Sequence, residues 1–371
     1  ARHCFTICGG EVMATPKLRF DGFSGNWVTT QLGNVCSFTQ GVQIPQSEQI
    51  NEERDGYIRY LYIRDFFSDK FKCYVPNIYP EKIIHPHEIM MVNTGNTTGE
   101  AYTGRYGVLS NNSFKISYDL AHFNDQFMYL FCSSELAQNQ IKKFFNAGGQ
   151  PHLGHKNISQ ILISYPKKEE QTKIASFLSA VDEKISQLTQ KHELLSQYKQ
   201  GMMQKLFSQQ IRFKADDGSE FGEWEEIALG KIKGVSIASG KSSHEKLELA
   251  KYYYYGSTGV IGYSNEYDYQ GTRILIARVG HNAGYIYMVS GQYNVSDNTL
   301  ILELPSNLDY IFIRAFLEKF QLNKLVFGTG QPLITGSLLK KVVIQVPCLE
   351  EQTKIANFLS AIDQKIEVVA Q

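Results

Sequence analysis

Residues 169–185 read EEQTKIASFLSAVDEKI, and residues 350–366 read EEQTKIANFLSAIDQKI. Fourteen of these seventeen positions are identical, and the two copies lie 181 residues apart. The same offset relates Gly149-Gln150-Pro151 to Gly330-Gln331-Pro332. This period is far too long for a solenoid of short repeats, so it indicates a duplicated module that contains a whole domain.

A second pair of similar segments opens each half of the chain. FSGNW at 23–27, with Leu-Gly at 32–33, matches EFGEW at 220–224, with Leu-Gly at 229–230. Between these anchors the halves diverge, apart from fragments such as IMMVNTGNTTG (89–99) and ILIARVGHNAG (274–284). This pattern predicts two variable domains that perform separate roles on a shared scaffold. A recent duplication without any division of roles is the alternative.

The segment after the first domain has the apolar pattern of a coiled coil. Apolar residues recur at alternating spacings of four and three, which is typical of a seam between two helices. At 1.5 Å per residue, the 40 residues from 169 to 208 would span about 60 Å. We expect the two helices to pack as an antiparallel coiled coil, although the second lacks a counterpart of residues 190–208. The predicted spacer and partner-helix positions are Ile174, Leu178, Val181, Ile185, Leu188, Leu195, Met202, Leu206, Ile355, Leu359, Ile362 and Ile366.

The variable domains mix strand-like and helix-like segments. Alternating apolar residues predict strands at 273–279 and 299–304, and longer apolar periods predict short helices at 124–146 and 309–327. The predicted fold class is α+β: two mixed α/β domains with mostly antiparallel sheets, separated by long helices. The expected boundaries are a leader outside the fold (1–13), the first domain (14–168), the spacer helix (169–208), the second domain (209–348) and a short C-terminal helix (349–371).

Composition narrows the class of protein. Hydrophobic residues make up 43% and charged residues 20%, as in soluble globular proteins, and no apolar run is long enough to span a bilayer. The six cysteines form no C-x-x-C pair, which favours reduced thiols in the cytoplasm over disulfides or a metal site. The net charge is zero, whereas nucleic-acid binders usually carry a basic excess. Any DNA-facing surface must therefore be a local patch, or a partner must supply part of the positive field.

The duplicated EEQTKI helix, the twofold W-x4-LG opening and the YYGSTGVIGY stretch at 254–263 resemble the DNA-specificity subunits of type I restriction-modification systems. The resemblance covers the chain from about Leu18 to the end. It implies that each domain is a target-recognition domain that reads one half of a bipartite double-stranded DNA target. It also implies that the helices set the spacer and dock two methyltransferase subunits, to which ATP-driven restriction subunits then bind. The short final helix and the first twelve residues depart from the family pattern.

Catalytic motifs are absent from the sequence. An adenine methyltransferase needs a glycine-rich cofactor loop and an N/D-P-P-Y tetrapeptide, and neither occurs. Gly240-Lys241-Ser242 resembles a phosphate loop, but the spacing requires glycine where Val235 stands. We therefore expect a non-catalytic subunit without cofactor or metal, and the resemblance places S-adenosylmethionine, ATP and magnesium on the partner subunits. We also expect no membrane partner.

Base reading needs polar side chains where the backbone can approach DNA, and glycine-flanked loops provide such places. Ordinary turn chemistry is the alternative for each candidate. Tyr252 to Tyr255 could stack on bases, although a half-buried tyrosine-rich strand is the simpler interpretation. The predicted DNA-binding residues are Gln40, Gln43, Asn93, Asn96, Arg105, Gln150, His152, Lys156, Lys241, Arg278, His281, Asn282 and Gln331.

Two other functions remain open at this point. The domains could process nucleic acid themselves, as an enzyme would. Alternatively, the chain could be an interaction scaffold without sequence specificity, such as an antitoxin-like regulator.

Overall fold

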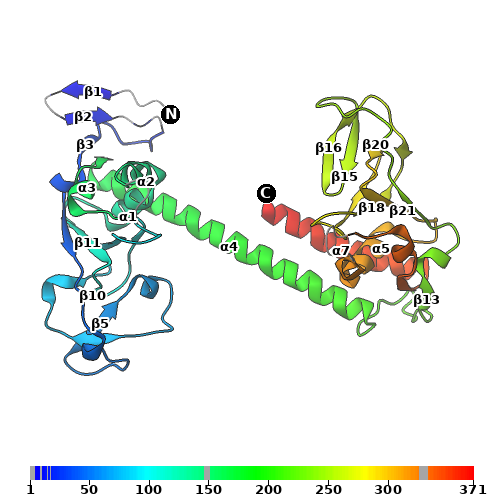
Figure 1. Cartoon of the computed structure of the whole chain (residues 1–371), viewed down its shortest axis with the longest axis horizontal. Helices are drawn as coiled ribbons and strands as arrows, with labels where there is room; N and C mark the ends of the chain where they lie inside the picture. The colour runs from blue at the N-terminus through cyan, green and yellow to red at the C-terminus, as the bar shows by residue number, and fades with distance from the viewer. Residues whose placement is uncertain (1–4, 9–10, 15, 17, 146–150, 326–332) are drawn as a thin grey trace. The chain divides into compact units, whose positions relative to one another are not determined.

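The computed structural model describes residues 5–8, 11–14, 16, 18–145, 151–325 and 333–371. The chain divides into two compact units, residues 1–184 and 185–371, and the division falls inside one long helix, α4 (Lys168–Phe207). Figure 1 shows α4 as a continuous helix; Gly201 does not interrupt it.

The first unit contains two four-stranded sheets. One has the order β4 (Cys36–Gln40), β11 (Ser113–Tyr118), β8 (Ile89–Val92), β9 (Ala101–Tyr102), and all its pairs are antiparallel. The other has the order β6 (Tyr74–Pro76), β5 (Tyr57–Leu61), β10 (Gly107–Leu109), β7 (Ile83–Ile84), with β5 and β10 parallel. The remaining elements are β1 (Phe5–Cys8), β2 (Glu11–Ala14), β3 (Val28–Gln31), β12 (Leu162–Tyr165), α1 (Asp125–Ser133), α2 (Glu135–Lys142) and α3 (His155–Ser159).

The second unit repeats this strand order. Its all-antiparallel sheet runs β14 (Ser236–Ser239), β21 (Thr299–Glu303), β18 (Arg273–Ala277), β19 (Ile286–Val289). Its other sheet runs β16 (Gly259–Ser264), β15 (Tyr252–Gly256), β20 (Gln292–Val295), β17 (Tyr269–Gln270), and β15 and β20 are again parallel. The unit also contains β13 (Glu225–Ala228), β22 (Val343–Val346), α5 (Tyr310–Phe320), α6 (Gly336–Lys340) and α7 (Leu349–Ala370). The two divergent halves therefore share one topology.

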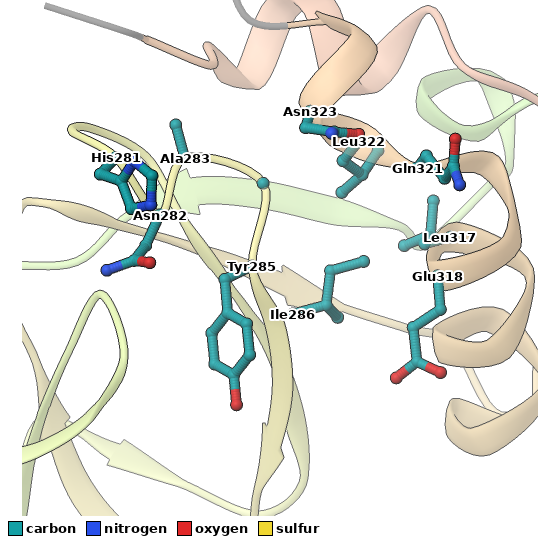
Figure 2. A pocket seen from close by; sticks show the side chains of 11 residues that line it. His281, Asn282, Ala283, Tyr285, Ile286, Leu317, Glu318, Gln321, Leu322 and Asn323 are labelled. Carbon is teal, nitrogen blue, oxygen red and sulfur yellow. The ribbon is translucent and has the colours of Figure 1, made fainter. Parts of the chain in front are cut away.

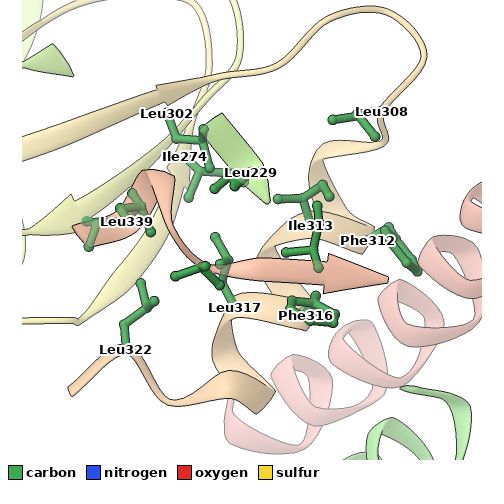
Figure 3. Close-up of a cluster of buried hydrophobic side chains, with 14 of the residues drawn as sticks. Leu229, Ile274, Leu302, Leu308, Phe312, Ile313, Phe316, Leu317, Leu322 and Leu339 are labelled. Atoms are coloured by element: carbon green, nitrogen blue, oxygen red, sulfur yellow. The ribbon is translucent and has the colours of Figure 1, made fainter. Parts of the chain in front are cut away.

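Each unit is built in layers around a strand that is buried on both faces. In β18, Ile274 belongs to the large apolar cluster that includes α5 (Figure 3), as does Ile276. Leu275 between them belongs to the cluster of the second sheet. Alternate residues of a strand point to opposite faces, so the sheet lies between the helices and the other sheet. In the first unit, Met91 and Met90 of β8 divide between two clusters in the same way.

The chain crosses from one sheet to the other at a glycine in both units. A Cβ on Gly41 would lie 2.0 Å from the carbonyl oxygen of Ser110, and one on Gly240 would lie 2.3 Å from that of Ser296. No larger residue fits this crossing without moving the backbone, so glycine is required there by close approach.

Helix α7 packs against the last part of α4 inside the second unit, and its direction is antiparallel. Lys199 pairs with Asp363 at 2.6 Å, while Leu206 shares an apolar cluster with Ile355 and Leu359. The predicted mixed fold with long helices is therefore confirmed. The predicted helix at 124–146 forms α1 and α2 with a break at Ser134, and the one at 309–327 forms α5 and a short 3-10 turn (Leu322–Leu325). Among the described residues, no helix is long and apolar enough to cross a membrane.

Candidate nucleic-acid interface

The structure brings two predicted loops of the first unit together. The loop after β8 and the loop before α3 form an antiparallel bridge between Thr94 and His152, whose Oγ1 and Nδ1 atoms lie 3.0 Å apart. The backbone N–H of Leu153 donates to the carbonyl of Asn93 at 2.8 Å. We call residues 93–99 and 151–154 the first loop pair. It joins segments about sixty residues apart in the sequence into one surface.

The second unit has the same arrangement at equivalent positions. Val279 bridges Leu333, and the N–H of Ile334 donates to the carbonyl of Arg278 at 2.8 Å. We call residues 278–284 and 333–335 the second loop pair. The predicted residues Gln150 and Gln331 lie beside these loops in the sequence but outside the described residues.

Individual candidates in the loop pairs differ in accessibility. Asn93 is 5% exposed, and its Oδ1 is buried without a hydrogen-bond partner in the described part of the chain. Asn96 and His152 are exposed. In the second unit, Arg278 is half-buried and donates from Nη1 to Ser239 Oγ at 3.3 Å, next to Gly240. This bond places Arg278 beside the exposed Lys241, so both cations belong to one edge of the second unit.

A cavity of about 500 Å³ adjoins the second loop pair. Figure 2 shows His281, Asn282 and Tyr285 on one side and Glu318 and Gln321 of the α5 end on the other. Hydrogen-bond donors and acceptors from both sides therefore face the same space. Ala283, Ile286, Leu317 and Leu322 also line this cavity, so its wall is part polar and part apolar, and the carboxylate of Glu318 disfavours a phosphate there.

Other candidates are held by their own domain. Gln40 donates from Nε2 to the carbonyls of Asn111 and Ser113 at 2.6 and 3.1 Å, and Asn111 donates to Gln43 Oε1 at 3.4 Å. Arg105 donates from Nη1 to both carboxylate oxygens of Asp69 at 3.1 Å. Hydrogen bonds from Arg59 and then from Arg105 lower the pKa of Asp69. Asp69 therefore stays ionised and neutralises part of the positive charge of Arg59 and Arg105.

Lys156 is the remaining candidate of the first unit. It is exposed on α3, and it has no ion pair within the described parts of the chain. A free cation of this kind can contact a phosphate without first breaking a bond to a carboxylate.

The EEQ segment that is repeated at the start of each helix has a structural role that could not be inferred from the sequence. Gln171 Oε1 accepts from the backbone N–H of Asn124 at 3.0 Å, and Gln352 Oε1 accepts from that of Asp309 at 2.9 Å. Both acceptors therefore hold the N-cap residue of the helix that covers the sheet. The preceding glutamates, Glu170 and Glu351, bind Arg19 and Arg212, which were not among the predicted site residues. An Arg-Phe pair ahead of each W-x4-LG opening was the available signal.

The first unit also contains a polar cavity whose lining residues were not predicted from the sequence. It measures about 760 Å³ and is lined by Gln46, Gln49, Asn51, Tyr62, Arg64, Lys70, Phe71, Lys72 and Cys73. The signal was the interleaving of basic and aromatic residues in KFK at 70–72.

Comparison with known proteins fits this arrangement of two similar units on helices. The family model for the type I restriction modification DNA specificity domain matches residues 24–197 and again 222–371. The MjaVIII specificity subunit of Methanocaldococcus jannaschii is 28% identical, over 92% of this chain and 87% of its own length. The EcoprrI specificity subunit of Escherichia coli is 23% identical, over 76% of this chain and 72% of its own.

Solved structures agree on the fold. An S subunit of a type I restriction-modification system from M. genitalium matches with a TM-score of 0.65 at 18% identity, covering 96% of this chain and 94% of that one. A chain from work on assembly and conformational transition of the type I system matches with a TM-score of 0.52, covering 95% and 93%. The chain thus belongs to a class of two-domain specificity subunits. It is a member of the family of type I restriction-modification DNA specificity proteins.

Proposed function

We propose that each unit reads one half of a bipartite double-stranded DNA target through its loop pair. The observation that carries this proposal is the repetition of one scaffold with different side chains. Both loop pairs occupy the same place in the same topology, yet Asn93 and His152 in the first correspond to Arg278 and Leu333 in the second. A shared scaffold that carries different side chains at matched positions suits two readers of different base sequences.

The helices are proposed to set the spacer between the half-sites and to dock methyltransferase subunits, to which restriction subunits are then added. Leu178 and Val181 of the predicted seam are each 38% exposed. Exposed apolar side chains in one strip favour packing against a further helix. The equivalent positions of α7, Leu359 and Ile362, are only 1% and 5% exposed, so this strip is a feature of α4 and is proposed as a docking surface for one methyltransferase subunit.

The chain itself is proposed to be non-catalytic, with S-adenosylmethionine, ATP and magnesium bound by its partners. The relatives that it matches are specificity subunits, which supports the proposal that catalysis and cofactor binding belong to partner subunits. A cytoplasmic location is also proposed, because Cys36, Cys73, Cys132 and Cys348 are free thiols and reduced cysteines suit that compartment.

Target selection tests the proposal. The chain, assembled with its cognate methyltransferase, is used to recover duplexes from a randomised library. We expect a split motif with a fixed spacer. Uniform recovery would favour the scaffold alternative, and methyl transfer or cleavage by the purified chain alone would favour the enzyme alternative.

A further inference from the structure

The polar cavity of the first unit is lined by three cations and by no carboxylate. Arg64, Lys70 and Lys72 all face it, and none has a carboxylate within 4.0 Å among the described residues. The nearby arginines behave differently, because Arg59 and Arg105 both pair with Asp69. A chain with zero net charge thus retains a local concentration of uncompensated positive charge, which attracts anions.

Aromatic rings hold Arg64 in place. Its guanidinium carbon lies 4.8 Å from the ring centroid of Tyr62 and 5.8 Å from that of Phe71. Tyr62 is fixed in turn, since its hydroxyl donates to Gln49 Oε1 at 2.9 Å. Contacts through the flat face of a guanidinium leave its N–H groups free. Arg64 is therefore positioned in advance, and its guanidinium N–H groups have no hydrogen-bond partner among the residues that the structure describes.

The cavity lies at the same edge of the unit as the first loop pair. Arg64 follows the end of β5, where the carbonyl of Leu61 accepts from the N–H of Ser110 at 2.9 Å. Two residues further on, the carbonyl of Asn112 accepts from the N–H of Asn93, the first residue of the loop pair, at 3.0 Å. One short turn therefore connects the cavity with the loops proposed to read bases, so one duplex could contact both.

We propose that this cavity binds the phosphodiester backbone of the first half-site, with Arg64 as its anchor and Lys70 and Lys72 adding charge. The inference rests on the proposed function and extends it to residues outside the loop pair. A fixed guanidinium fork matches two oxygens of a phosphate. Neighbouring lysines strengthen such contacts without adding sequence preference. The site therefore positions the duplex, while the loop pair reads it.

The test compares Arg64→Gln with wild type in the assembled methyltransferase complex, using the selected target duplex and a scrambled duplex over a range of salt. We expect binding to weaken roughly tenfold on both duplexes. The slope of log affinity against log salt should fall by about 1. Arg64→Lys should keep the wild-type salt slope, because the charge remains, but should recover only part of the affinity, because an ammonium lacks the planar fork. The matched control is Arg54→Gln, an exposed arginine over Tyr57 ahead of β5, which should change nothing.

The double substitution Lys70→Gln with Lys72→Gln keeps the test decisive if Arg64→Gln fails to fold, and it should also weaken both duplexes equally. If the folded Arg64 and lysine variants bound both duplexes with wild-type affinity, the proposal that this cavity binds the DNA backbone would be wrong. A loss confined to the target duplex would overturn the phosphate assignment in favour of base reading. Failure of the wild-type complex to prefer any duplex would instead defeat the proposed function, which is a separate outcome.

Discussion

The guanidinium of Arg212 donates two hydrogen bonds to the carboxylate of Glu351, from Nε to Oε1 at 3.1 Å and from Nη2 to Oε2 at 2.8 Å. Trp224 donates a third from Nε1 to Oε2 at 3.0 Å, and the carboxylate is fully buried. The first unit has the same pair, in which Arg19 donates to Glu170 at 2.7 and 2.6 Å. This ion pair ties the opening segment of each domain to the helix that follows it.

Glu351→Gln should destabilise the second unit by about 2–4 kcal/mol, because it leaves the largely buried Arg212 without its counterion. The neighbouring Glu350→Gln is the matched control. The side chain of Glu350 is 57% exposed and lies 3.8 Å from Lys354, so this substitution should lower the free energy of unfolding by less than about 0.5 kcal/mol. Denaturant titration of the full chain, followed by tryptophan fluorescence, measures both. If both substitutions lowered the free energy of unfolding equally, the buried Arg212–Glu351 ion pair would not be what stabilises the domain.

The repeated EEQ could be recognised from sequence, but its role could not. A repeated motif on a coiled-coil helix first suggests partner binding, whereas Glu170 and Gln171 face their own domain. Their partners lie about 50 to 150 residues away in the sequence, and one chain without an alignment does not reveal such pairs. The helix itself was predictable because its 4-3 apolar spacing is local.

One loop of each loop pair could be predicted from the sequence, whereas the sheet of each unit that contains a parallel strand pair could not. The similar fragments at 89–99 and 274–284 marked one loop of each pair. The parallel pairing of β5 with β10, and of β15 with β20, joins strands some forty to fifty residues apart that carry no shared motif. The cation cavity is lined by residues within 46–73, so its basic and aromatic residues are close in the sequence, but the packing of Tyr62 and Phe71 around Arg64 became visible only in the fold.

Arg278→Ala should relax specificity at one base pair of the second half-site, with a cost of about 1–3 kcal/mol against the correct base if the contact is bidentate. Ser239 helps to hold the guanidinium in place. The control is Arg273→Ala at the other end of β18, where the guanidinium binds Glu303 at 2.6 Å and should not affect recognition. Binding to single-base variants of the selected target distinguishes the outcomes. An equal loss on all sequences would reassign Arg278 to a phosphate contact.

The isolated chain should bind DNA weakly. Its net charge is zero, so it releases few counterions without a partner. Addition of the methyltransferase should tighten binding and steepen the salt dependence. Anisotropy titrations with and without the partner measure this, and nanomolar sequence-specific binding by the chain alone at physiological salt would contradict it.

The continuous helix α4 is expected to act as a ruler, with half-site centres about one DNA turn apart, roughly 10 base pairs or 34 Å. Four residues inserted near Gln190 add about 6 Å of helix. The preferred spacer should then lengthen by one or two base pairs, and both half-sites should stay unchanged. A one-residue insertion is the control, because it rotates the seam by about 100° and should impair assembly. Selection on libraries with variable spacers measures the result, and an unchanged spacer would show that α4 does not set the distance.

The central claim is that each unit reads its own half of the target. Its most direct test is to replace residues 36–148 with the same region of a relative and to repeat target selection with the methyltransferase complex. This exchange removes the β8 loop and the Arg64 cavity of the first unit but retains Arg19, Glu170 and the whole of α4. We predict that one half-site changes while the other half-site and the spacer remain as in wild type. A change in both half-sites would contradict the account.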